Sequence, residues 1–135
     1  MSEYLFAYGT LQHGHAPGEI AATVAKLCPV GEGFVAGTLY DLGEYPGAIL
    51  DPSPTRNIYG TVFELPEDAE LLRQLDAYEG FNPNNPDQSL FVRTMQTVML
   101  MAGGELPCWV YEYNRSPVGA RIVESGIFRK NRDAP

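Results

Sequence analysis

The chain has 135 residues, of which 44% are hydrophobic and 19% charged, and this is the size and composition of one folded domain. Its net charge of −8, from 9 basic and 17 acidic side chains, makes nucleic acid and anionic membrane surfaces poor partners. The sequence lacks both a signal peptide pattern and the roughly 20 apolar residues of a membrane span, so we expect a cytoplasmic protein.

The first half of the chain predicts strands separated by glycine and proline turns. A short apolar and aromatic run predicts a buried strand over Tyr4–Tyr8. A glycine-rich loop follows, and apolar residues at helical spacing then predict a helix over Glu19–Cys28. Strands are predicted over Gly33–Leu42 and Asn57–Leu65, with a turn at Glu44–Gly47 between them.

The second half predicts one clear helix and a hairpin. The helix begins at Pro66, has an acidic first turn and an apolar face, and ends at Gly80. A polar loop over 81–90 leads to a strand over Phe91–Met101, which a pair of glycines joins to a second strand over Leu106–Tyr113. Because regular alternation of strands and helices is missing, we expect an α+β domain on an antiparallel or mixed sheet.

Charge is unevenly distributed along the chain. Residues 1–113 carry 4 basic and 15 acidic side chains, whereas residues 114–135 carry 5 basic and 2 acidic ones. We expect the basic tail, residues 116–135, to dock on the acidic body up to about Phe128 and to be disordered beyond it, within a single domain over 1–135. A frayed terminus, or a tail that binds an acidic partner, is the competing interpretation.

The cysteines and histidines do not predict a metal or redox site. Cys28 and Cys108 are too far apart for a Cys-x-x-Cys motif, and both have apolar neighbours, so we expect two buried small hydrophobic residues. His13 and His15 lie in the glycine-rich loop without an acidic or cysteine partner in the motif. We therefore expect no metal and no cofactor.

The turn after the first strand is one candidate binding site. It comprises Tyr8, Gly9, Thr10 and Leu11, and a glycine at the end of a strand allows successive backbone N–H groups to face one anion. Such a turn binds a carboxylate or phosphate group. The alternative interpretation is an ordinary glycine turn.

Glu79 is the candidate for acid–base chemistry. It lies at the C-terminal end of the predicted helix, where the helix dipole disfavours negative charge, and Tyr78 and Phe81 would shield it from water. Both effects raise the pKa of a carboxyl group, as a general base working near neutral pH requires. The alternative is a glutamate exposed on the surface.

Three further residues are candidates for substrate contact. Arg93 lies in a predicted strand and can pair with the carboxylate of a substrate or with a structural Asp or Glu. Tyr45 and Tyr113 either contact the substrate or are half-buried residues of the sheet.

Several segments, in this order, resemble the γ-glutamylcyclotransferase-like family, which includes the AIG2-like and γ-glutamylamine cyclotransferase proteins. The resemblance runs from about residue 4 to about residue 113, and a weaker likeness to the closing segment of the family lies at Glu124–Phe128. The segments that carry it are Leu5–Leu11, Gly14, Gly37–Tyr40, Tyr45–Gly47, Leu75–Gly80 and Phe91–Arg93.

The resemblance implies a small mixed β-barrel-like sheet with flanking helices and a cavity at its mouth. It implies that the Tyr8–Leu11 turn binds the carboxylate of a γ-glutamyl group and that Glu79 is the catalytic acid and base. The implied reaction is attack of the substrate's α-amine on its own γ-carbonyl, which releases 5-oxoproline and a free amine. Phe91 replaces a tyrosine that is frequent in related sequences, and this favours the alternative of a binding module without turnover.

Overall fold

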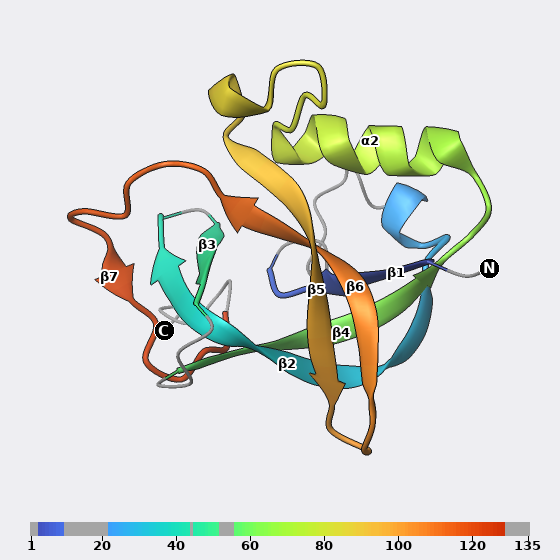
Figure 1. Ribbon diagram of the computed structural model, residues 1–135, viewed down its shortest axis with the longest axis horizontal. Helices are drawn as coiled ribbons and strands as arrows, with labels where there is room; N and C mark the ends of the chain where they lie inside the picture. The colour runs from blue at the N-terminus through green and yellow to red at the C-terminus, as the bar shows by residue number, and fades with distance from the viewer. Residues whose placement is uncertain (1–2, 10–21, 44, 52–55, 129–135) are drawn as a thin grey trace.

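The computed structural model describes residues 3–9, 22–43, 45–51 and 56–128. Helix α2 and the 3-10 turn η1 lie between the fourth and fifth strands, and residues 22–24 are also helical (Figure 1). The elements are β1 (Glu3–Ala7), β2 (Cys28–Asp41), β3 (Pro46–Leu50), β4 (Asn57–Leu65), α2 (Ala69–Glu79), η1 (Pro86–Gln88), β5 (Phe91–Leu100), β6 (Glu105–Tyr113) and β7 (Arg121–Ile122).

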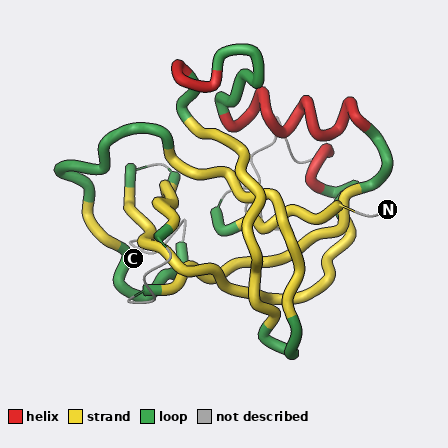
Figure 2. The backbone as a smooth tube through the Cα atoms, viewed as in Figure 1, coloured by secondary structure: helices red, strands yellow, loops and turns green. Residues whose placement is uncertain are grey.

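Five strands close into a barrel in the order β2, β4, β1, β6 and β5 (Figure 2). The barrel closes where β2 pairs with β5, with Gly33 opposite Leu100. β1 and β6 run parallel, and the other pairs in the barrel are antiparallel. The fold class expected from the resemblance, a small mixed barrel-like sheet with flanking helices, is confirmed.

β1 is buried on both of its faces, which explains why it is apolar at successive positions. Leu5 and Ala7 belong to the hydrophobic cluster that includes the buried face of α2, whereas Phe6 and Tyr8 belong to the second cluster, with Val35, Val62 and Val98. Side chains alternate along a strand, so β1 packs into two hydrophobic clusters at once.

The ends of α2 follow local capping chemistry. The helix begins later than Pro66, because the Asp68 side chain accepts a hydrogen bond of 3.0 Å from the Glu70 N–H and so caps it. It ends where predicted, with Gly80 at φ 75° in the left-handed region. Neither α2 nor any other helix of the described residues is long and apolar enough to cross a membrane.

Two expectations for the first half of the chain are wrong. Cys28 does not end a helix but begins β2, and its side chain is exposed, whereas Cys108 is buried as expected. Pro46 and Gly47 do not form a turn but begin β3, which pairs with β2 opposite Asp41 and Tyr40. The pairing with β2 supplies the hydrogen bonds that make this segment a strand, and the local sequence does not reveal it.

Residues 121–128 return to the barrel. β7 pairs with β2, with Ile122 opposite Tyr40, and the Tyr59 N–H donates to the Gly126 carbonyl at 2.9 Å. Phe128 is 5% exposed and packs in the same cluster as Val35 and Val62. The disorder expected after Phe128 concerns residues 129–135, which lie outside the described residues.

Candidate active site

Glu79 is the last residue of α2 and is half-buried beside the barrel. Burial raises the pKa of its carboxyl group to about 8. The rise expected from the sequence is therefore present, and desolvation is its cause. A carboxyl group with this pKa gains and loses a proton near neutral pH, as an acid–base catalyst must.

The hydroxyl of Tyr8 interacts electrostatically with Glu79 and forms two hydrogen bonds within the protein. It donates a hydrogen bond to the main-chain carbonyl of Tyr111 and accepts one of 3.3 Å from the Ala48 N–H. Burial raises the pKa of Tyr8 well above its usual value, and the negative charge of Glu79 adds to this rise. Tyr8 is therefore a neutral phenol that joins β1 to β6 and β3, close to the Glu79 carboxyl group.

Gly9 follows β1 and lies against the first residue of β3. A Cβ atom at Gly9 would lie 2.7 Å from Pro46 Cγ, so this close approach requires glycine. Gly80 and Gly126 have a left-handed backbone, but Gly9 does not. Thr10 and Leu11 lie outside the described residues, so the anion-binding turn stays a prediction.

An aromatic cluster adjoins this turn. The Phe91 ring lies 6.0 Å from the ring of Tyr45 and 5.5 Å from that of Tyr113, measured between ring centroids. Tyr45 directly precedes Pro46, and Pro46 touches Gly9, so the cluster lies beside the end of β1. The fold thus brings Tyr8, Gly9, Tyr45 and Tyr113 to one end of the barrel.

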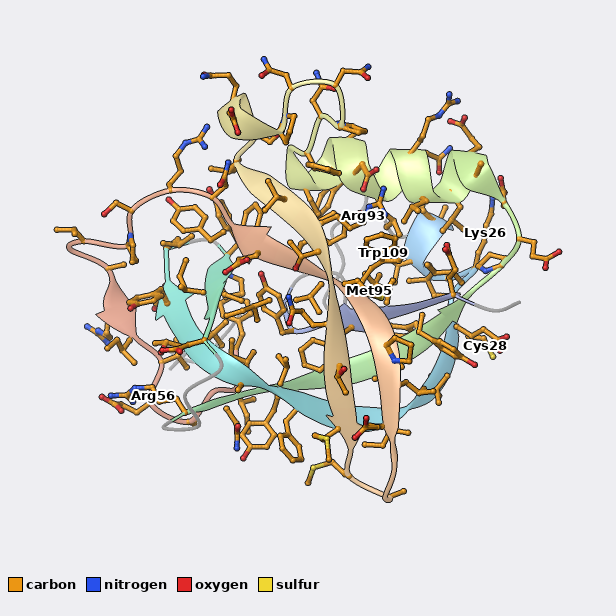
Figure 3. All side chains as sticks on the ribbon, viewed as in Figure 1. Lys26, Cys28, Arg56, Arg93, Met95 and Trp109 are labelled. Carbon is orange, nitrogen blue, oxygen red and sulfur yellow. The ribbon has the colours of Figure 1, made fainter. Side chains whose placement is uncertain are left out.

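Arg93 is held by the protein's own carboxylate. Its Nε donates to Asp76 Oδ1 at 2.8 Å, and its Nη2 donates to Asp76 Oδ2 at 3.1 Å. The guanidinium also lies 4.3 Å from the ring centroid of Trp109, and Figure 3 shows the two side chains together. Of the two pairings considered for Arg93, the structure shows the structural one.

Three residues near the site, Asp76, Tyr111 and Glu112, were not among the site residues predicted from the sequence. Asp76 is 4% exposed and accepts a hydrogen bond of 2.6 Å from the Tyr111 hydroxyl. Glu112 accepts a hydrogen bond of 2.9 Å from the Leu50 N–H, and its charge also raises the pKa of Tyr8. The spacing of three residues between Asp76 and Glu79, which places both on one helix face, is the signal that could have revealed Asp76.

Metal ligands do not gather in the part of the chain that the structure describes. No three His, Cys, Asp or Glu side chains come together there as a metal ion would require. His13 and His15 lie outside that part. The described part of the site consists of the Glu79 carboxyl group, the end of β1 at Tyr8 and Gly9, and aromatic rings.

Comparisons with known proteins place the chain in a family. The family described as gamma-glutamyl cyclotransferase, AIG2-like, matches residues 5–130. No curated protein sequence matches the chain.

Solved structures share the fold. An AIG2-like protein from Mus musculus is 24% identical, with a TM-score of 0.70 over 92% of this chain and 87% of that one. YkqA from Bacillus subtilis is 20% identical, with a TM-score of 0.70 over 97% of this chain, which spans 41% of the length of YkqA. A protein described as gamma-glutamyl cyclotransferase is 16% identical, with a TM-score of 0.62 over 90% of this chain and 70% of that one. Because the family model matches residues 5–130, the chain belongs to the gamma-glutamyl cyclotransferase, AIG2-like family.

Proposed function

We propose that this protein is a γ-glutamyl cyclotransferase that acts on a γ-glutamyl amine or peptide. The α-amine nitrogen of the substrate attacks the γ-carbonyl carbon and forms the five-membered ring. The bond from that carbon to the leaving nitrogen then breaks, and the products are 5-oxoproline and a free amine. Membership of the family supports cyclotransferase chemistry in general.

The observation that carries the proposal is the half-buried Glu79 with a pKa of about 8, beside Tyr8 and the end of β1. An α-amine is mostly protonated at neutral pH and cannot attack until it loses a proton. Proton transfer is efficient when the pKa of the base lies near the working pH, as that of Glu79 does. Glu79 takes this proton and returns it to the leaving amine, so the protons balance over the cycle.

The Tyr8–Leu11 turn supplies orientation. In the proposal, its backbone N–H groups hold the α-carboxylate, while Tyr45 and Tyr113 border the carbon chain. Fixing the carboxylate places the neighbouring amine near both the γ-carbonyl and Glu79. The amine and the carbonyl already belong to one molecule, so the contribution of the turn is to hold the substrate in the conformation that brings them together beside Glu79.

The test is to incubate the protein with a panel of γ-glutamyl amines and γ-glutamyl dipeptides and to measure 5-oxoproline. Glu79→Gln removes the acid and base but keeps the size of the side chain, so turnover should stop. Glu67→Gln, on an exposed residue just before α2, is the matched control and should keep full activity. Equal turnover by Glu79→Gln and wild type would refute the proposed mechanism.

A binding module without turnover is the second candidate function. Phe91 favours it, because its ring lies between Tyr45 and Tyr113 and has no hydroxyl group to offer a substrate. Calorimetry with the same γ-glutamyl compounds and with free glutamate distinguishes the two candidates. Saturable binding without 5-oxoproline formation would favour the binding module over the enzyme.

A further inference from the structure

Tyr111 on β6 forms hydrogen bonds to both parts of the candidate site, the helix that carries Glu79 and the end of β1. Its hydroxyl donates a hydrogen bond of 2.6 Å to Asp76 Oδ1 on α2, the helix that ends with Glu79. Its main-chain carbonyl accepts the hydrogen bond from the Tyr8 hydroxyl, directly before Gly9. One residue therefore joins the helix with the candidate base to the strand that leads into the carboxylate-binding turn.

Asp76 is a rigid attachment point for the last turn of α2. Arg93 on β5 holds both of its carboxylate oxygens, and the Tyr111 hydroxyl adds a third hydrogen bond. Bidentate pairs of this kind fix geometry as well as charge. Asp76 precedes Glu79 by three residues, so the two side chains share a helix face, and holding Asp76 in place limits where Glu79 can reach.

The charge of Asp76 is compensated locally. The Arg93 guanidinium balances it and packs against the rings of Trp109 and Phe81. Burial, and not repulsion from Asp76, raises the pKa of Glu79. Glu79 interacts electrostatically with Tyr8 and Tyr111, and Asp76, Arg93 and Glu112 each interact with one of these two tyrosines.

We propose that Tyr111 and Asp76 are positioning residues, which set the distance between the Glu79 carboxyl group and the end of β1 at Tyr8 and Gly9. The proposal rests on the proposed function, because Glu79 must meet the amine of a substrate whose carboxylate the turn holds. Neither residue touches the substrate in this scheme. A displacement of about 1 Å between reacting groups costs on the order of 100-fold in rate, so small changes in this attachment are measurable.

Tyr111→Phe tests the proposal, because it removes the bond to Asp76 and leaves the main-chain bond to Tyr8. We expect kcat to fall about 10- to 100-fold while KM changes less than about threefold, since the turn still binds the carboxylate. Tyr59→Phe removes a tyrosine hydroxyl from β4 and is the matched control. A kcat within about twofold of wild type, in a variant that is folded at the assay temperature, would overturn the proposal.

Titration of Glu79, followed by carbon-13 NMR of its carboxyl carbon, is a readout independent of turnover. In Tyr111→Phe the loosened helix end admits water, so the pKa of Glu79 should fall by about one unit or more. An unchanged pKa of Glu79 would contradict the positioning role.

The two proposals can fail separately. If wild type forms no 5-oxoproline but the pKa of Glu79 shifts in Tyr111→Phe, the proposed function fails and the positioning role stands. If Tyr111→Phe does not fold, Asp76→Asn weakens the same hydrogen bond from the helix side and is judged by the same outcomes.

Discussion

At the scale of single residues, the chemistry depends on how burial changes Glu79. The carboxyl group sits at the end of α2, where water is partly excluded, and its pKa of about 8 follows from that exclusion. The sequence indicated this from the position of Glu79 near a helix end between Tyr78 and Phe81. It could not indicate the contacts of Asp76, because Arg93 and Tyr111 are 17 and 35 residues away.

The pH dependence of turnover follows from this pKa. If Glu79 acts as the base, kcat/KM should rise with pH through a limb centred near pH 8 and not near the ordinary glutamate value of about 4.3. The measurement is a pH–rate profile for 5-oxoproline release. The substrate's own amine is titrated separately by NMR, so that its contribution to the profile is known. A limb near pH 4 would contradict the assignment of Glu79.

The same pKa makes the stability of the protein depend on pH. The folded protein keeps the Glu79 proton up to about pH 8, whereas the unfolded chain releases it near pH 4.3, so stability falls as pH rises between these values. Glu79→Gln removes this loss. Between pH 5 and pH 8.5, the free energy of unfolding of wild type should fall by roughly 1–3 kcal/mol more than that of the variant. This is less than the whole pKa shift would give, because Glu79 is only half-buried.

Urea denaturation at each pH gives the free energies of unfolding that this comparison needs. Glu67→Gln serves as the control and should follow wild type. Parallel stability curves for wild type and Glu79→Gln would show that the Glu79 carboxyl group titrates normally in the folded protein.

At the scale of elements, the end of α2 determines where Glu79 lies. Gly80 has φ 75°, and a Cβ atom there would lie 3.2 Å from Leu90 Cβ. Gly80→Ala should therefore cost about 1–2 kcal/mol of stability and also lower kcat, since it disturbs the residue next to Glu79. Thermal denaturation and the turnover assay check the two effects.

Gly103→Ala is the control for this change. Gly103 has φ 111° in the turn between β5 and β6, and a Cβ atom added there would meet nothing within 4 Å, so it tests backbone strain away from the site. It should lower stability and leave kcat unchanged. An equal loss of kcat in both variants would show that the effect of Gly80→Ala comes from instability alone.

Local signals predicted most of the elements. β1, β4, the β5–β6 hairpin and the end of α2 lie close to where apolar pattern, glycine and proline placed them. β7 was missed because its partner, β2, is distant in the sequence. β3 pairs with the neighbouring end of β2, with Pro46 opposite Asp41, and was missed because the two residues that begin it do not have a strand pattern. Pro46 and Gly47 are typical of turns, and only pairing with β2 makes them a strand.

At the scale of the whole molecule, residues 121–128 dock through apolar contacts and strand pairing. The charge distribution predicted an attraction between a basic tail and an acidic body. In the described part of the tail, an ion pair joins Arg56 of the body to Glu124, and the basic residues after Phe128 lie outside that part. Both side chains are exposed, so this pair contributes little. Phe128, buried at 5% exposure, contributes more.

Phe128→Ala should therefore lower the free energy of unfolding by about 3 kcal/mol, as removal of a buried aromatic ring does. Ile127→Ala is the matched control, because Ile127 is 40% exposed, and it should cost less than about 1 kcal/mol. Denaturant titration of both variants measures the difference. Equal stability of the two variants would mean that residues 121–128 are not part of the folded core in solution.

The proposed mechanism requires the turn after β1 to bind the α-carboxylate, and Glu79 to face the neighbouring α-amine, of the same γ-glutamyl group. A crystal structure of the protein with bound 5-oxoproline tests it most directly. We expect the carboxylate of 5-oxoproline to accept hydrogen bonds from backbone N–H groups of residues 9–11, with its ring nitrogen within hydrogen-bond distance of Glu79. Density for the ligand elsewhere, or at the turn with Glu79 turned away into solvent, would refute the proposed mechanism.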